Sequence, residues 1–110
     1  MAMTQTKLHA PSQLGNSAAT LYTVPASTTT IVKQVALCNT TATNRTVSLY
    51  LVPNGGTAGV ANAVLYDVPV DSKSTIFVNM SAVMATGDFI SGSASVASAV
   101  TVHSFGIQEA

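Results

Sequence analysis

Residues 46–56, TVSLYLVPNGG, decide the fold class of this chain. Within them Val47, Leu49 and Leu51 alternate with Ser48 and Tyr50, which is the period-two pattern of a β-strand with one buried face. The Pro-Asn-Gly-Gly run that follows is a strong turn signal, because these residues suit the backbone conformations of tight connections. The stretch therefore predicts a strand that ends in a reversal of the chain.

The same rhythm continues on both sides of this strand. Short runs rich in Val, Ile, Leu, Thr and Tyr are separated by turn-forming residues at spacings of about 8 to 14 residues. The predicted strands cover residues 20–24, 29–38, 46–52, 63–70, 74–80, 89–92 and 99–107. Helix formers are scarce between them. The pattern predicts an all-β fold, an antiparallel two-sheet β-sandwich of about 6 to 8 strands, either Ig-like or jelly-roll-like.

In two of these strands, the alternation of apolar residues predicts which side chains share a face. In the strand over residues 29–38, one face carries Ile31, Val35 and Leu37 and the other carries Val32, Ala36 and Cys38. In the strand over residues 63–70, one side carries Val64, Tyr66, Val68 and Val70, and Pro69 marks a sheet edge or a strand end.

The first 17 residues have neither a strand nor a helix period, and they contain Pro11 and the turn-like pair Gly15-Asn16. We therefore predict an extended N-terminal arm over residues 1–17 and a β-sandwich domain over residues 18–110. Residues 1–15 have one lysine and no apolar run, so the pattern predicts neither a secretion signal nor a membrane span, and synthesis in the cytoplasm.

Charge is scarce along the whole chain. Charged residues make up 7% of the sequence and the formal net charge is zero, whereas an ordinary soluble domain has about 25% charged residues. Hydroxyl-rich stretches such as residues 28–30, 39–43 and 91–98 are expected to cover the surface instead. Such a surface loses little solvation when another chain packs on it, so the composition favours protein association. The few basic residues are scattered, which argues against nucleic-acid binding.

The residues that could support catalysis are few and dispersed. They are Cys38, His9, His103, Asp67, Asp71, Asp88 and Glu109. Because a catalytic site needs such groups to converge, the sequence predicts no enzyme, no cofactor, no metal site and no catalytic residue. Cys38 is the single cysteine, so no internal disulfide is possible, and at an apolar strand position it is expected to be a small buried hydrophobe.

Several sharper interpretations compete with this one. Asp67, Asp71 and Asp88 could supply oxygen ligands to Ca²⁺, and Cys38 with His103 could form a nucleophile and base. The loop over residues 54–59 superficially resembles a phosphate-binding loop, although no Gly-Lys-Ser/Thr follows. Tyr22, Tyr50 and Tyr66 could build a sugar-binding face. Ordinary turn chemistry and strand packing account for each of these features more simply.

Three segments together resemble a recurrent tailed-phage virion module. They are residues 20–26 (TLYTVPA), residues 31–40 (IVKQVALCNT) and residues 47–53 (VSLYLVP). The likeness continues through a glycine-rich turn, residues 62–67 (NAVLYD) and residues 87–90 (GDFI), and covers roughly residues 20–108. The resemblance implies a β-sandwich in a phage particle and carries over no catalytic residue.

From these patterns we expect a non-enzymatic virion structural protein, and within that class a capsid decoration (cement) protein. Its partners would be the major capsid protein or neck and tail proteins, with self-association as a trimer or dimer and no contact with nucleic acid or membrane. The alternatives are a neck, tail or fibre component and a carbohydrate-binding or receptor-binding module.

Overall fold

The computed structural model describes residues 3–109, which form nine β-strands and one short 3₁₀ turn. In chain order these are β1 (Met3–Lys7), β2 (Ser12–Gln13), β3 (Ala19–Thr23), β4 (Thr29–Asn39), β5 (Arg45–Val52), η1 (Val60–Asn62), β6 (Ala63–Val70), β7 (Thr75–Met84), β8 (Phe89–Ala94) and β9 (Val100–Glu109). Over this range no helix is long and apolar enough to cross a membrane.

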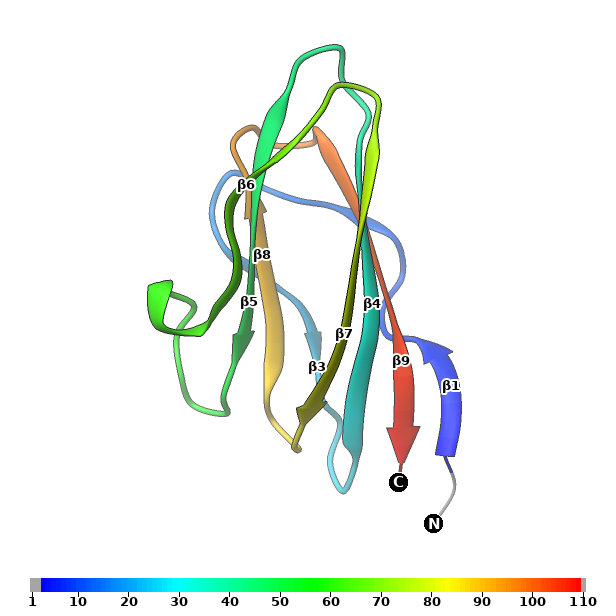
Figure 1. The fold of residues 1–110 in the computed structure, drawn as a ribbon. Helices are drawn as coiled ribbons and strands as arrows, with labels where there is room; N and C mark the ends of the chain where they lie inside the picture. The colour runs from blue at the N-terminus through cyan, green and yellow to red at the C-terminus, as the bar shows by residue number, and fades with distance from the viewer. Residues whose placement is uncertain (1–2, 110) are drawn as a thin grey trace.

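The strands form two antiparallel sheets that pack face to face (Figure 1). The five-stranded sheet has the order β1-β9-β4-β7, with β2 continuing the β1 edge along β9, and the four-stranded sheet has the order β3-β8-β5-β6. The pairs are nested along the chain: β5 pairs with β6, β4 with β7, β3 with β8 and β1 with β9. This nesting is jelly-roll-like, so the predicted all-β sandwich is confirmed and the jelly-roll alternative is the better description.

Apolar side chains from both sheets fill the space between them. Val32, Val35 and Leu37 on β4 face Val47 and Leu49 on β5, and all five are almost fully buried. The turn predicted after β5 is present, since the Gly56 amide donates to the Pro53 carbonyl oxygen at 2.8 Å. Gly55 has a φ of 81°, a conformation that residues other than glycine rarely adopt.

The predicted faces of β4 are wrong at its first half. Val32, not Ile31, is buried together with Val35 and Leu37, and Ile31 lies on the opposite side. The cause is a register shift between Val32 and Gln34, where β4 has one residue more than β9 opposite it. One extra residue exchanges the two faces of a strand from that point on.

A second bulge changes the faces of β6. The four residues predicted to share one side are divided: Val68 and Val70 point to the core, whereas Val64 and Tyr66 are exposed and Leu65 packs against the core instead. The register against β5 shifts between Val68 and Leu65, where Asp67 has a φ of 50°. Pro69 lies in β6, and β6 is an edge strand of its sheet, as its proline predicts.

The sequence predicts an arm over residues 1–17, and the described part of that segment is extended but runs along the sandwich. β1 and β2 both pair with β9, and the chain then crosses to the other sheet, where the Gly15 carbonyl oxygen accepts from the Ala94 amide at 2.9 Å. Leu8 and Leu14 are buried in the core. These two isolated leucines give no periodic signal, which is why the segment reads as unpatterned.

Candidate interaction surface

The solvent side of the five-stranded sheet carries large apolar side chains that nothing covers in the described chain. Strand alternation and register place them there: Phe77 and His103 flank Ala36, and Val83 and Ile107 flank Ile31. We call this surface the outer face and define it by Met3, Ile31, Ala36, Phe77, Val83, His103, Phe105 and Ile107.

Four residues of the outer face are well exposed. Met3 is 63% exposed, Phe77 62%, Val83 70% and Phe105 38%. Most soluble monomers bury residues of this size or scatter them singly, and an apolar group gathered on one face marks an interaction site. The remaining large exposed hydrophobic residues, Val60, Val64, Tyr66 and Val96, lie outside the strands of this sheet.

Two shallow hollows lie on the outer face, and both are lined by Phe105 and Lys33. One is completed by Gln34, Asn79, Met80 and Ser81, and the other by Gln5, Thr6, Gly106 and Ile107. Both hollows lie where the register of β4 against β7 and against β9 shifts, between Val32 and Gln34. The bulge of β4 therefore shapes this part of the surface.

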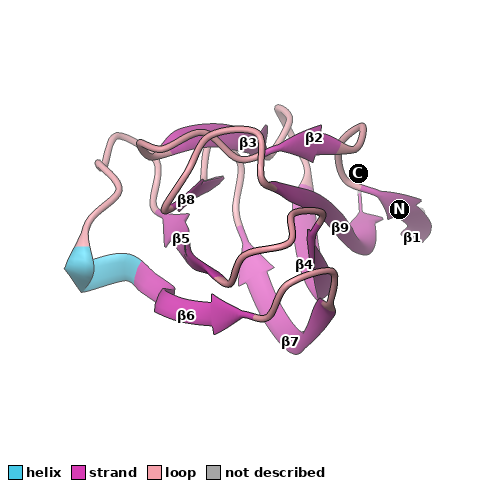
Figure 2. Ribbon diagram, turned by 90° about the horizontal axis from the view of Figure 1, so that it is seen from above, coloured by secondary structure: helices cyan, strands magenta, loops and turns pink. Residues whose placement is uncertain are grey.

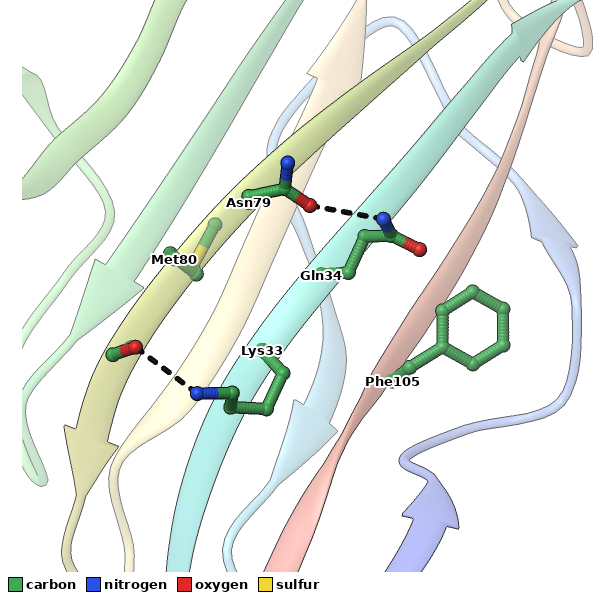
Figure 3. Close-up of a pocket in the computed structure, with 6 residues that line it drawn as sticks. Lys33, Gln34, Asn79, Met80 and Phe105 are labelled. Carbon is green, nitrogen blue, oxygen red and sulfur yellow. Dashed lines mark hydrogen bonds between the residues drawn. The ribbon is translucent and has the colours of Figure 1, made fainter.

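Polar groups in the first hollow are paired with one another. The Gln34 side-chain amide donates to Asn79 Oδ1 at 2.9 Å, and Lys33 Nζ donates to Ser81 Oγ at 3.2 Å (Figure 3). These contacts run from β4 to β7 and hold the polar side chains against the sheet. Phe105 is left as an apolar projection beside them.

His103 and Cys38 both lie on the solvent side of the five-stranded sheet. The His103 ring stacks on Phe105, with ring centroids 6.1 Å apart and planes 15° from parallel. Cys38 is half-buried and pairs with Thr101, whereas His103 pairs with Ala36. Cys38 and His103 are thus diagonal neighbours on two strands, and the described residues show no hydrogen bond between them. Their arrangement is that of surface packing.

The three aspartates proposed as possible calcium ligands have separate structural roles. The Asp88 carboxylate accepts from the backbone amides of Asn54 and Ala85, both at 2.9 Å, and so anchors the base of the loop after β5. Asp67 occupies the bulge of β6, and the backbone carbonyl oxygen of Asp71 accepts from the Ser74 amide in the turn between β6 and β7. Within residues 3–109, no three His, Cys, Asp or Glu side chains gather as metal ligands would.

The three tyrosines do not share a surface. Tyr22 and Tyr50 are buried, and only Tyr66 is exposed. The Tyr22 hydroxyl bonds the Thr30 hydroxyl at 2.8 Å and accepts from the Gln108 side-chain amide at 2.6 Å. This places Tyr22 in a contact between the two sheets, and a sugar-stacking face made of all three rings is not formed.

Some polar residues expected on the surface are buried instead. Thr30, Asn39 and Ser91 are almost completely inaccessible to solvent. Each has a hydrogen-bond partner, and no described buried side-chain nitrogen or oxygen lacks one. These residues therefore fix the packing of the sandwich and do not contribute to a docking surface.

The geometry defines the chain as a jelly-roll-like β-sandwich with exposed apolar side chains on the solvent side of one sheet. No protein-family model matches the sequence, and no curated protein does either. Among solved structures, the fold is similar to Bacillus endospore appendages, which form disulfide-linked pili, at 16% sequence identity and a TM-score of 0.59. That match covers 96% of this chain and 86% of the pilus chain.

The fold is also similar to a chain of infectious bursal disease virus, strain Gx, at 15% identity and a TM-score of 0.57. This match covers 97% of the present chain but 32% of the viral chain, so the sandwich corresponds to one part of that larger protein. Cys38 is the single cysteine of these 110 residues, so two cysteines cannot pair within one copy.

Proposed function

We propose that the chain is a non-enzymatic structural protein of a phage virion, and specifically a capsid decoration protein that docks through its outer face. The exposed apolar side chains gathered on the five-stranded sheet carry this proposal. A rigid sheet holds them in fixed positions, and their burial against a partner would supply most of the binding energy.

The dimensions of the outer face suit a protein partner. Four strands spaced about 4.8 Å apart, with about 3.3 Å per residue over ten residues, offer roughly 600 Å². A standard interface buries about 800 Å² on each partner, so this face together with neighbouring loops is large enough. The bonded pair Gln34–Asn79 lies between the apolar residues around Ala36 and those around Ile31. The face therefore mixes apolar and polar groups, as protein interfaces generally do.

The phage setting rests on the resemblance of residues 20–108 to a tailed-phage virion module. The fold similarity to pili and to a viral chain supports a role in an assembly. Low charge and hydroxyl-rich loops support a docked subunit, because few charges need to be desolvated on binding. The expected partner is the major capsid protein, and the expected location is the virion.

Particles of the encoding phage, prepared with and without this protein, test the proposal. We expect particles that lack it to release their genome at a lower temperature, and added purified protein to restore the original midpoint. The variant Phe105→Ser should not restore it, because it removes the apolar projection between the two hollows. The matched control Tyr66→Ser, on the other sheet, should restore it fully.

Two results would count against the proposal. If particles without the protein were as heat-resistant as complete particles, a cement role would be excluded. If the protein were found at the neck, tail or fibre in a map of the particle, the decoration assignment would be replaced by that location. Binding to a glycan array by the isolated domain would favour a receptor-binding module instead.

A further inference from the structure

The two sheets of the described chain have four edges, and three of these edges have features that hinder pairing with another chain. β6 contains Pro69 and the bulge at Asp67, β3 has five residues and a register shift at Leu21, and β1 has five residues and ends at Lys7. Natural proteins protect sheet edges with such short strands, bulges, prolines and lysines.

β7 lacks the proline, the lysine and the short length that protect the other edges. It runs for ten residues, contains no charged residue and no proline, and lies at the end of the five-stranded sheet. Its exposed and partly buried residues alternate along its length, and its register against β4 shifts between Asn79 and Ala82, where β7 has one residue more than β4. Its free backbone groups therefore form a long and uncharged edge that can pair with another strand.

β7 also lies where the sandwich is incompletely closed. It is joined to β6 by a short turn, and the two edge strands lie on the same side of the molecule (Figure 2). Its core-facing residues pack against the core but remain partly accessible: Ile76, Val78, Met80 and Ala82. A partner placed against this edge would cover them as well as the exposed residues.

We propose that β7 pairs with β7 of a second copy of this chain, antiparallel, about a two-fold axis at Met80. In this register Phe77 lies opposite Val83 of the partner subunit, and Asn79 lies opposite Ser81 of the partner subunit. On the core side, Val78 faces the partner's Ala82 and Ile76 faces the partner's Met84. Apolar residues thus meet apolar residues and polar residues meet polar ones on both faces.

Neighbouring registers do not match in this way. Moving the axis to Asn79 sets Phe77 opposite the partner's Ser81 and Val83 opposite the partner's Thr75. An axis that falls between two residues would place core-facing side chains opposite exposed ones, since side chains alternate along a strand. Cross-strand pairs of aromatic and β-branched residues stabilise antiparallel sheets, so the Met80 register is the favoured one.

The pairing joins the five-stranded sheets of two copies edge to edge into one continuous sheet. It therefore places two outer faces side by side and doubles the apolar docking surface. This inference deepens the proposed function, because it rests on self-association of the same subunit, and it names the strand and register that produce it. With no charged side chain in β7, the association should depend little on salt.

A charge-pair exchange measured by sedimentation equilibrium tests the register. We expect the wild-type protein to be a dimer, and the single variants Phe77→Lys and Val83→Glu each to weaken dimerisation by about tenfold or more. The combined variant Phe77→Lys/Val83→Glu should dimerise again, because each new ammonium group faces a new carboxylate across the axis. Within one copy the two positions are too far apart to pair, being six strand residues or about 20 Å from each other.

Tyr66→Lys, on the other sheet, is the matched control and should leave the dimer unchanged, and the urea midpoint of every variant checks that it is folded. A wild-type monomer would overturn the pairing, whereas the heat resistance of particles and the Phe105→Ser variant would still decide the proposed function. If every β7 variant formed the same oligomer as the wild type, the chain would still self-associate, but the contact would not be at β7. Two weakened single variants without recovery in the combined variant would overturn the Met80 register.

Discussion

The side-chain amide of Asn39, at the end of β4, donates a 3.0 Å hydrogen bond to the carbonyl oxygen of Val70, at the end of β6. This contact connects the two sheets at one end of the sandwich. The same amide donates to the Thr43 carbonyl oxygen at 2.8 Å, and Asn39 Oδ1 accepts from the Thr41 amide at 2.9 Å. Asn39 is fully buried, so each of these bonds replaces one to water.

Replacing Asn39 should destabilise the fold strongly. Asn39→Ala leaves the Val70 and Thr43 carbonyl oxygens and the Thr41 amide without this partner, which we expect to lower the free energy of unfolding by about 2 to 4 kcal/mol. Urea unfolding followed by circular dichroism measures the change. The control Asn44→Ala removes an exposed bond to the Ser72 amide and should cost less than about 1 kcal/mol. Equal effects of the two variants would refute a special role for Asn39.

A second polar contact between the sheets gives a thermodynamic cycle. Tyr22→Phe removes the hydroxyl that bonds Thr30 and Gln108, and should cost about 1 to 2 kcal/mol because the Thr30 hydroxyl is left buried. Thr30→Val in the same chain removes the hydroxyl that Tyr22→Phe leaves without a partner. The double variant should therefore lose less free energy of unfolding than the two single variants lose together. Strict additivity in urea unfolding would show that the two hydroxyls are not coupled.

The close approach of β9 to β4 requires glycine at position 106. A Cβ atom added to Gly106 would collide with the carbonyl oxygen of Ile31, a backbone atom that cannot move without the strand. Gly106→Ala should therefore lower stability by about 1 to 3 kcal/mol, and it should also alter the hollow lined by Phe105. Gly59→Ala is the control, since a Cβ there meets only the Thr57 carbonyl oxygen at 4.0 Å. An unchanged thermal midpoint for Gly106→Ala would contradict the described register.

The N-terminal segment should contribute to stability before any partner binds. Leu14 is 1% exposed in the core, and its amide donates to the Val100 carbonyl oxygen at 2.9 Å. Leu14→Ala should cost about 2 to 5 kcal/mol, the usual range for a buried leucine. The control Ser12→Ala changes an exposed side chain in β2 and should have little effect. If Leu14→Ala unfolded at the wild-type urea concentration, the segment would be an arm that packs only on docking.

The strand order could not be read from the sequence, but the strands themselves could. Local alternation and turn residues predict β5 and its turn, because both signals depend on residues close in the chain. The exchange of faces at Ile31 and at Tyr66 could not be predicted, since each follows from one extra residue that only the neighbouring strand reveals. The outer face was missed for the same reason: Phe77 and Val83 are apolar at alternating positions, and the sequence does not say which side a sheet buries.

The sequence by itself determined an all-β sandwich with little charge, since composition and period two act locally and need no partner strand. The tertiary structure alone decided the nested strand order, the burial of Leu14 and Asn39, and the exposure of Phe77, Val83 and Phe105. Those features depend on which distant strands meet and in which register. A shift of one residue there moves a side chain from the core to solvent.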